Sequence, residues 1–190
     1  MLKILRKYFC LFLAMAVFPS ASALAEPNPE AIYAEEYKIK AGFLYYFAKF
    51  VEWPPGVFDN TKDKVVLGVL GKDPFSGALE SLEGQAVMGK KIAIKRFHDV
   101  EELDACHVLF ISSSEKDSLP QILRALKKSK ILTVGDSEGF TRQGGTIGFI
   151  TEGKQVHFEI NLKAAEEAGL VLSARLLSLA RNIKGLKNKN

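Results

Sequence analysis

Three apolar runs limit the folds open to this chain more than any other feature of its sequence. Val65–Leu70, His107–Ser112 and Ile131–Val134 are almost unbroken runs of apolar residues. Strands with apolar residues on both sides belong inside a sheet that is covered on both faces, as parallel sheets are. The three runs therefore predict central strands.

Three further segments are predicted strands. Lys91–Phe97 and Gln155–Ile160 alternate apolar and polar residues, which is typical of edge positions or a partly open face. Thr146–Thr151 completes the set, and Glu152-Gly153-Lys154 after it predicts a tight hairpin.

Helical patterns fill the intervals between these strands. Ile39, Phe43, Phe47 and Phe50 share one face of a helix predicted over Ala31–Val51, and Trp53-Pro54-Pro55-Gly56 ends it. Shorter helical segments are predicted at Phe75–Leu82, Val100–Leu103, Ser118–Lys128 (with a Ser118…Gln121 capping box), Leu162–Ala168 and Leu172–Ile183. The alternation predicts a three-layer α/β domain. Its mostly parallel six-stranded sheet ends in a C-terminal antiparallel hairpin, with helices on both faces.

The first 25 residues have the pattern of a secretory signal. Lys3, Arg6 and Lys7 precede an apolar run from Tyr8 to Phe18, and small residues lead to a cleavage site after Ala25. We therefore expect a soluble periplasmic protein with four parts: the signal (1–25), a flexible leader and helix start (26–36), one α/β domain (37–183) and a basic tail (184–190). Without the signal, 23 Lys and Arg face 22 Asp and Glu, so charge gives no case for nucleic-acid binding.

Cysteine and histidine usage favours neither a disulfide nor a metal site. Cys106 is the one cysteine left after the predicted cleavage, so we expect a buried apolar residue, with a reactive or intermolecular thiol as the alternative. His98, His107 and His157 lack the spacing of a metal site. We predict no metal and no cofactor.

The loops after the central strands carry the candidate small-ligand site. The carboxyl ends of strands in a doubly wound sheet converge, and ligands bind there. The candidate pocket residues are Gly71, Asp73, Ser112, Ser113, Gly135 and Asp136. Gly135-Asp136-Ser137-Glu138-Gly139 also matches the G-x-S-x-G pattern of hydrolases, but the polar, glycine-rich residues after it are poor helix formers. We therefore favour a glycine-rich turn and predict no catalytic residues.

Five residues are candidates for contact with a partner protein: Phe50, Trp53, Phe158, Glu159 and Asn161. Trp53, the sole tryptophan, follows an aromatic helix on a Pro-flanked loop, where it either anchors the core or binds a partner. Glu159 and Asn161 end the last strand, either as a solvated edge or as a polar contact point.

Several segments resemble the YfiR-like family (DUF4154). The segments are 40–54 (KAGFLYYFAKFVEWP), 106–111 (CHVLFI), Gly144–Ile147, Val156–Asn161 and Ala168–Leu170, and the likeness runs from about Tyr37 to Ala180. The resemblance implies a homodimeric periplasmic regulator that represses the sensory domain of an inner-membrane diguanylate cyclase and lowers cyclic di-GMP. An outer-membrane lipoprotein partner is also implied. Some members of the family contain intramolecular disulfides, but none is expected here, because Cys106 has no second cysteine to pair with after the predicted cleavage.

Two readings compete with a regulator that acts by protein contact. One is a periplasmic small-ligand-binding protein that reports to a receptor or transporter, which predicts a pocket at the strand ends. The other is a hydrolase built on Ser137, which the sequence disfavours.

Overall fold

A computed structural model describes residues 28–61 and 64–185 of the chain. The predicted signal and most of the predicted basic tail lie outside the described residues. Within those ranges, no helix has the length and apolar character needed to cross a membrane.

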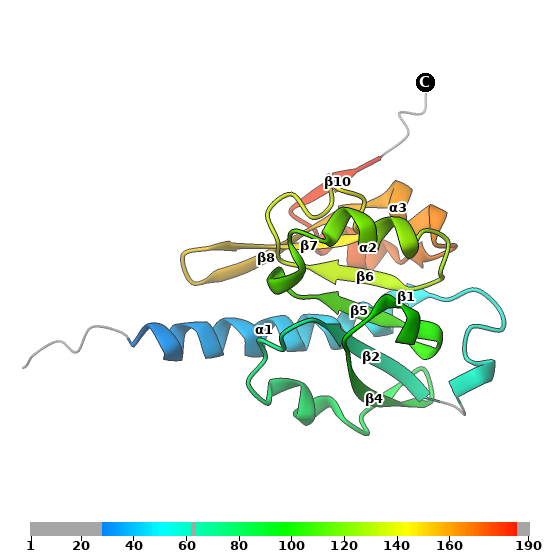
Figure 1. Ribbon diagram of the computed structural model, residues 1–190, viewed down its shortest axis with the longest axis horizontal. Coiled ribbons are helices and arrows are strands. Elements are labelled where there is room, and N and C mark those ends of the chain that lie inside the picture. The colour runs from blue at the N-terminus through cyan, green and yellow to red at the C-terminus, as the bar shows by residue number, and fades with distance from the viewer. Residues whose placement is uncertain (1–27, 62–63, 186–190) are drawn as a thin grey trace, which may run out of the picture.

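The centre of the molecule is a mixed sheet of eight strands in the order β10-β8-β7-β6-β5-β2-β4-β3 (Figure 1). Each of the six predicted strands is present, with its ends within one residue of the prediction. They are β2 (Lys64–Leu70), β4 (Lys90–Phe97), β5 (Val108–Ile111), β6 (Leu132–Gly135), β7 (Ile147–Glu152) and β8 (Gln155–Asn161). β7 and β8 form the predicted antiparallel hairpin, whereas β4, β2, β5, β6 and β7 are parallel neighbours.

The prediction of six strands was wrong. Two short strands extend the sheet at its edges, β3 (Ala86–Val87) beside β4 and β10 (Asn182–Lys184) beside β8. β1 (Val51–Glu52) and β9 (Val171–Leu172) form a separate antiparallel pair. Residues 182 and 183 were expected to end a helix, and residue 184 to begin the basic tail. They are extended because the open edge of β8 offers backbone groups to them, and the N–H of Arg181 bonds the carbonyl of Phe158.

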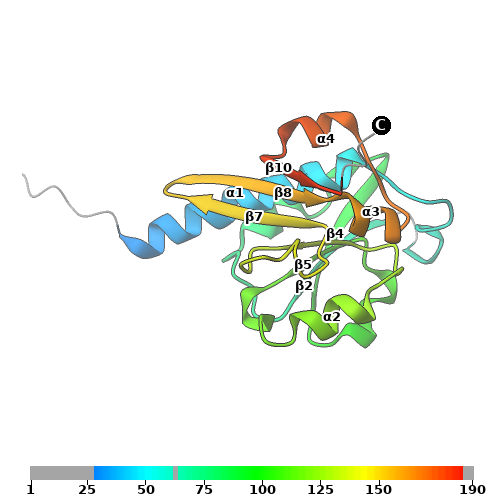
Figure 2. The same ribbon diagram turned by 90° about the horizontal axis from the view of Figure 1, so that it is seen from above.

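The long helix α1 (Pro29–Phe50) packs on one face of the sheet (Figure 2). It begins two residues earlier than predicted, because Asn28 caps it and Pro29 occupies its first turn. Tyr37, Ala41, Leu44, Phe47 and Ala48 are buried. The predicted stripe is only partly buried: Phe47 is in the core, but Ile39 is 38% exposed. The buried face of α1 is therefore rotated from the predicted face. Ala41 and Ala48 explain the difference, because their small side chains let this face approach the sheet closely.

Two apolar cores lie on opposite faces of the sheet. Val65, Leu67 and Val69 of β2 point into the core beneath α1, whereas Val66 and Leu70 point into the core beneath α2 (Leu119–Ala125). Figure 2 shows α1 and α2 on opposite sides of the strands. This two-sided burial is the physical reason for the unbroken apolar runs.

Most of the remaining predicted helices are shorter in the structure, but the turn predicted at Val100–Leu103 extends to Ala105, and the turns at Asp59–Thr61 and Ser113–Glu115 were not predicted. The remaining helical elements are α3 (Leu162–Glu167), α4 (Ala174–Leu179) and the 3-10 turns Asp59–Thr61, Ala78–Leu82, Val100–Ala105 and Ser113–Glu115. The capping-box prediction at Ser118 was wrong: its side chain makes no cap hydrogen bond. Its backbone is already helical (φ −93, ψ −6), whereas a capping serine needs an extended conformation to reach the free N–H groups.

Candidate functional site

The carboxyl ends of β2, β5 and β6 meet at one edge of the sheet. The chain runs from β2 to β4 on one side and then returns to β5 on the other, so β2 and β5 flank the point where strand order reverses. Leu70 is level with Ile111, and Ile111 with Gly135. The structure thus brings the predicted pocket residues Gly71, Asp73, Ser112, Ser113, Gly135 and Asp136 to one edge.

An open hollow of about 640 Å³ lies over this edge. Asp73, Ser112 and Ser113 line it, but Gly71, Gly135 and Asp136 do not. The other lining residues come from α1 and the same two loops: Tyr33, Lys72, Pro74, Ser76, Ser114 and Lys116. Serine hydroxyls, two lysines and one tyrosine ring lie among apolar atoms in this lining, which is mixed in character.

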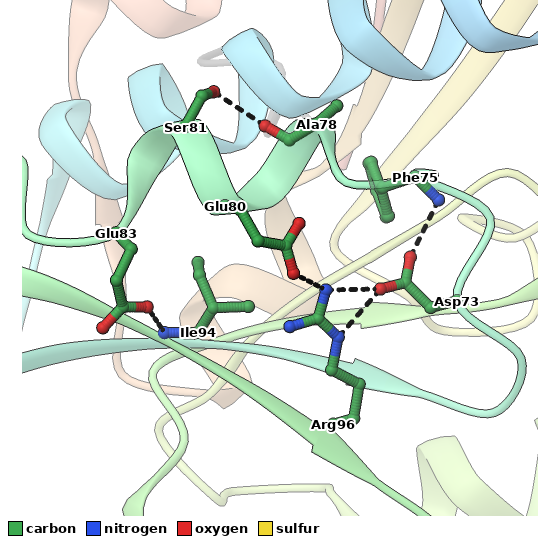
Figure 3. Close-up of polar contacts among 8 residues, drawn as sticks. All are labelled: Asp73, Phe75, Ala78, Glu80, Ser81, Glu83, Ile94 and Arg96. Atoms are coloured by element: carbon green, nitrogen blue, oxygen red, sulfur yellow. Dashed lines mark hydrogen bonds and ion pairs between the residues drawn. The ribbon is translucent and has the colours of Figure 1, made fainter.

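Arg96 of β4 fixes the loop that carries Asp73 (Figure 3). Its Nε donates to Oδ2 of Asp73 at 2.8 Å, and its Nη2 donates to Oε1 of Glu80 at 2.5 Å. Burial opposes the charge of Arg96, but the bonds to the two carboxylates raise its pKa above the ordinary value. The other oxygen, Oδ1 of Asp73, accepts from the N–H of Phe75 at 2.8 Å. Both carboxylate oxygens of Asp73 are therefore used in hydrogen bonds that hold its own loop in place.

The two loops that line the hollow are bonded to each other. Oγ of Ser114 accepts from the N–H of Lys72 at 3.0 Å and donates to Oε1 of Glu115 at 3.1 Å. Gly71 is required between them: its φ is +86, and an added Cβ would lie 2.5 Å from Oγ of Ser114. The rim of the hollow is therefore built in advance of any ligand.

A buried ionic cluster joins α1 to the end of β6. Nζ of Lys40 lies 2.7 Å from Oδ2 of Asp136 and 2.6 Å from Oε1 of Glu36, and only 2% of the Lys40 side chain is exposed. The hydroxyl of Tyr37 donates to the same Oδ2 at 2.5 Å. Burial, followed by the bond to Asp136, raises the pKa of Tyr37 well above its ordinary value.

Sequence reasoning placed Asp136 at the strand end but missed Lys40 and Tyr37. The available signal was the position of Lys40 on the helix face that also carries Tyr37, Ala41 and Leu44. A lysine on an apolar face needs a buried carboxylate partner.

The G-x-S-x-G segment forms the predicted glycine-rich turn. No helix follows Ser137, so the serine lacks the setting of a nucleophile elbow. The glycines have a packing role instead. A Cβ at Gly135 or Gly145 would lie 2.4 Å or 2.0 Å from the ring of Phe140, which is fully buried.

Phe50, the last residue of α1, and Trp53, which follows the short strand β1, are two of the five predicted contact residues. Both are half-buried. Phe50 stacks on Tyr46, with ring centroids 6.0 Å apart, and the guanidinium of Arg175 lies 5.0 Å from its ring. Trp53 packs edge-on against Phe58 and His107, and its Nε1 donates to the carbonyl of Ala48 at 3.4 Å.

The other three predicted contact residues make internal contacts. Phe158 is in the core, 1% exposed. Glu159 accepts a hydrogen bond from Thr141 and lies 3.3 Å from Nζ of Lys184. Asn161 caps α3, where its Oδ1 accepts from the N–H of Ala164 at 3.2 Å. Phe158 lines a hollow together with Phe50, whereas Glu159 and Asn161 bond to other parts of the chain.

Comparison with protein families gives a match over most of the described structure. The model of the YfiR/HmsC-like family (DUF4154) matches residues 37–181. The chain belongs to this family. The match extends from the middle of α1 to the residue before β10, so it includes Phe50, Trp53 and the lining of the strand-end hollow except Tyr33. No curated protein matches the chain.

Two solved structures share the fold. One is an ABC domain in complex with L-Trp from Streptococcus pneumonia, with a TM-score of 0.50 and 12% identity over 75% of this chain. The other is a conserved domain protein from Vibrio cholerae O1 biovar El Tor, with a TM-score of 0.50 and 11% identity over 78% of this chain. The chain spans 60% of the length of each.

Proposed function

We propose that this YfiR/HmsC-like chain is a non-enzymatic periplasmic regulator. It binds the periplasmic sensory domain of an inner-membrane diguanylate cyclase and holds the enzyme inactive, which lowers cyclic di-GMP. The single observation that carries the proposal is the family match over residues 37–181. The predicted signal at residues 1–25 supports the compartment.

The contact surface that we propose for this receptor surrounds the carboxyl end of α1. Phe50 and Trp53 are half-buried there, and the neighbouring pair β1–β9 presents Val171, which is 58% exposed. Aromatic side chains that are partly held by their own fold lose little freedom on binding, so they suit an interface. Phe158 lies beneath this region and supports it from the core.

Repression requires that the regulator bind the inactive receptor more tightly than the active one. A shift of the receptor from 1% to 99% inactive needs a difference in affinity of about 10⁴-fold. We also propose that an outer-membrane lipoprotein relieves repression by binding the regulator, and that the regulator is a homodimer.

Deletion of the gene tests the function directly. We expect cyclic di-GMP to rise in the deletion strain and to return to normal when the wild-type gene is restored. The Val171→Asp variant should fold normally, fail to restore the low level, and fail to retain the receptor domain in a pull-down. Met88→Asp is the matched control, because Met88 is also exposed but lies on the turn between β3 and β4. An unchanged cyclic di-GMP level in the deletion strain would refute the proposal.

The strand-end hollow favours a second candidate function, the binding of a small ligand. The hollow of about 640 Å³ lies where doubly wound folds bind ligands. L-Trp is a reasonable first probe, because a protein of the same fold was solved with it. At 100 times its Kd a ligand stabilises the folded state by about 2.7 kcal/mol, which is measurable as a higher melting temperature. The Ser113→Trp variant, which fills the hollow, should abolish that rise.

A further inference from the structure

The outward face of α1 carries a regular stripe of exposed residues. Ile32, Ile39 and Tyr46 follow one another at intervals of seven residues, and all three are exposed by 38–50%. Glu35, Gly42 and Lys49 form a second row at the same interval, offset by three residues. A seven-residue repeat keeps both rows on one side of a helix, which is the pattern of a helix with a helical partner. We call these six residues the α1 stripe.

The α1 stripe lies between two apolar hollows. One, of about 290 Å³, is lined by Ile32, Glu35 and Ile39 together with Thr151 of the β7–β8 hairpin. The other, of about 220 Å³, is lined by Tyr46 and Phe50 together with Leu179 of α4, which is 60% exposed. The two hollows thus lie at opposite ends of the stripe. The first half of α1 extends beyond the sheet beside the hairpin, so this face is open to another molecule (Figures 1 and 2).

The α1 stripe is complementary to its own reversed copy. Gly42 is its midpoint, with Glu35 seven residues before it and Lys49 seven residues after it. If two copies of α1 cross antiparallel at Gly42, Glu35 of each copy faces Lys49 of the other. Ile39 of each copy then lies beside the other copy's Tyr46. A two-fold axis requires this reciprocity, because residue i must meet j wherever j meets i.

Gly42 has the local structure that such a crossing needs. Apart from the adjoining backbone of its own helix, an added Cβ at this position would have no described atom within 4 Å. A glycine in the middle of a helix weakens that helix, so its presence calls for a compensating close approach. Here the close approach is not supplied by the rest of the described chain.

We propose that the α1 stripe is the homodimer interface, in which a second copy of this chain lays its α1 antiparallel across Gly42. The inference rests on one part of the proposed function, the homodimer. The ring of Tyr46 enters the hollow beside Ile39 of the second copy. Exposed ion pairs contribute little free energy, so the Glu35–Lys49 pairs set direction and register while the apolar residues and the hollows supply affinity.

The first test measures oligomeric state. The chain produced from its full-length gene should sediment as a dimer that dissociates on dilution. Gly42→Leu should raise the dimer dissociation constant at least tenfold, because the leucines would collide at the axis, while leaving the monomer folded. Ala34→Leu is the matched control, since Ala34 is exposed on α1 outside the stripe. A monomeric wild-type chain, or a dimer that tolerates Gly42→Leu, would overturn the proposal.

The second test exchanges the charges. Glu35→Lys and Lys49→Glu should each weaken the dimer, because each places like charges opposite one another across the axis. The double variant restores opposite charges at both positions and should recover most of the affinity. Glu101→Lys, on the 3-10 turn Val100–Ala105, controls for net charge. Additive weakening in the double variant would contradict the antiparallel register.

The third test traps the axis covalently. Gly42→Cys should form an intermolecular disulfide under mild oxidation, whereas Ala34→Cys should not. Cys106 does not interfere, because it is buried. None of the three tests involves the receptor. If the chain dimerises through α1 but has no effect on cyclic di-GMP, the proposed function fails and this inference stands. If the chain lowers cyclic di-GMP but does not dimerise through α1, this inference fails and the proposed function stands.

Discussion

Lys40 and Asp136 are 96 residues apart in sequence, yet they form a buried ion pair with 2.7 Å between Nζ and Oδ2. The pair fastens the long helix to the turn that follows β6. Tyr37 adds its hydroxyl to the same carboxylate oxygen, so two α1 side chains depend on one acidic residue. This cluster adjoins the strand-end hollow through Tyr33, whose ring lies 4.6 Å from that of Tyr37.

Removal of Lys40 should destabilise the protein strongly. Lys40→Ala leaves the carboxylate of Asp136 buried without its cation, a change that costs about 3–5 kcal/mol when a buried pair is broken. Equilibrium unfolding in urea measures it. The control is Lys38→Ala, which removes a lysine whose side chain is 71% exposed and should change stability by less than about 0.5 kcal/mol. Equal effects of the two substitutions would show that the buried pair does not stabilise the fold.

Acid should destabilise the protein through His107. Its Nδ1 accepts from the N–H of Val66 at 2.9 Å, so its Nε2–H faces the carbonyl of Val57 at 3.3 Å. Burial, reinforced by the charge of Lys90, lowers the pKa of His107 below 6.5. The unfolded chain therefore binds this proton more readily than the folded chain, and the free energy of unfolding has its full value above pH 6.5. As the pH drops from 6.5 toward the lowered pKa, the free energy of unfolding falls by up to about 1.4 kcal/mol per pH unit.

Trp53 gives a direct measurement of this transition, because it is the only tryptophan and its ring contacts that of His107. Its fluorescence should change as the pH falls below 6.5 in the wild-type chain but not in His107→Gln. His98→Gln removes an exposed histidine and should leave the pH profile unchanged. A wild-type profile that persists in His107→Gln would assign the transition to another group.

Cys106 should be inert in the folded protein. Burial raises the pKa of its thiol to about 12, so almost no thiolate is present at pH 8. In a chain that lacks residues 1–25, and with them Cys10, a thiol reagent should label it slowly in buffer and fully in denaturant. Ser113→Cys places an exposed thiol on the strand-end loop and should react at once. Rapid labelling of native Cys106 would contradict its burial.

Glycines at two positions should respond in opposite directions to alanine. Gly145→Ala drives a methyl group into the ring of Phe140 and should destabilise the fold by about 1–3 kcal/mol. Gly42→Ala adds a methyl group in open space on a helix and should stabilise the monomer by about 0.5–1 kcal/mol. Urea unfolding of dilute protein measures both. If both substitutions changed the free energy of unfolding by the same amount, the different surroundings of the two glycines would not explain the effects.

The sequence predicted what local pattern controls. The strands β2, β5 and β6 were found because residues buried on both faces must all be apolar, and the β7–β8 hairpin was found because its turn contains glycine. The strand-end loops followed from these strands. The edge strand β10 was missed, because three residues carry no pattern of their own and become extended only beside β8.

The sequence by itself determined the central strands, the long helix and the family, because apolar periodicity and segment order are properties of the chain. Tertiary structure alone decided the partners of isolated polar residues. The position of Lys40 on the apolar face of α1 indicates that it needs a carboxylate partner, but only the fold shows that the partner is Asp136. Gly42 is an ordinary glycine until the sheet covers the opposite side of its helix. Contacts between distant residues depend on packing, which no local pattern encodes.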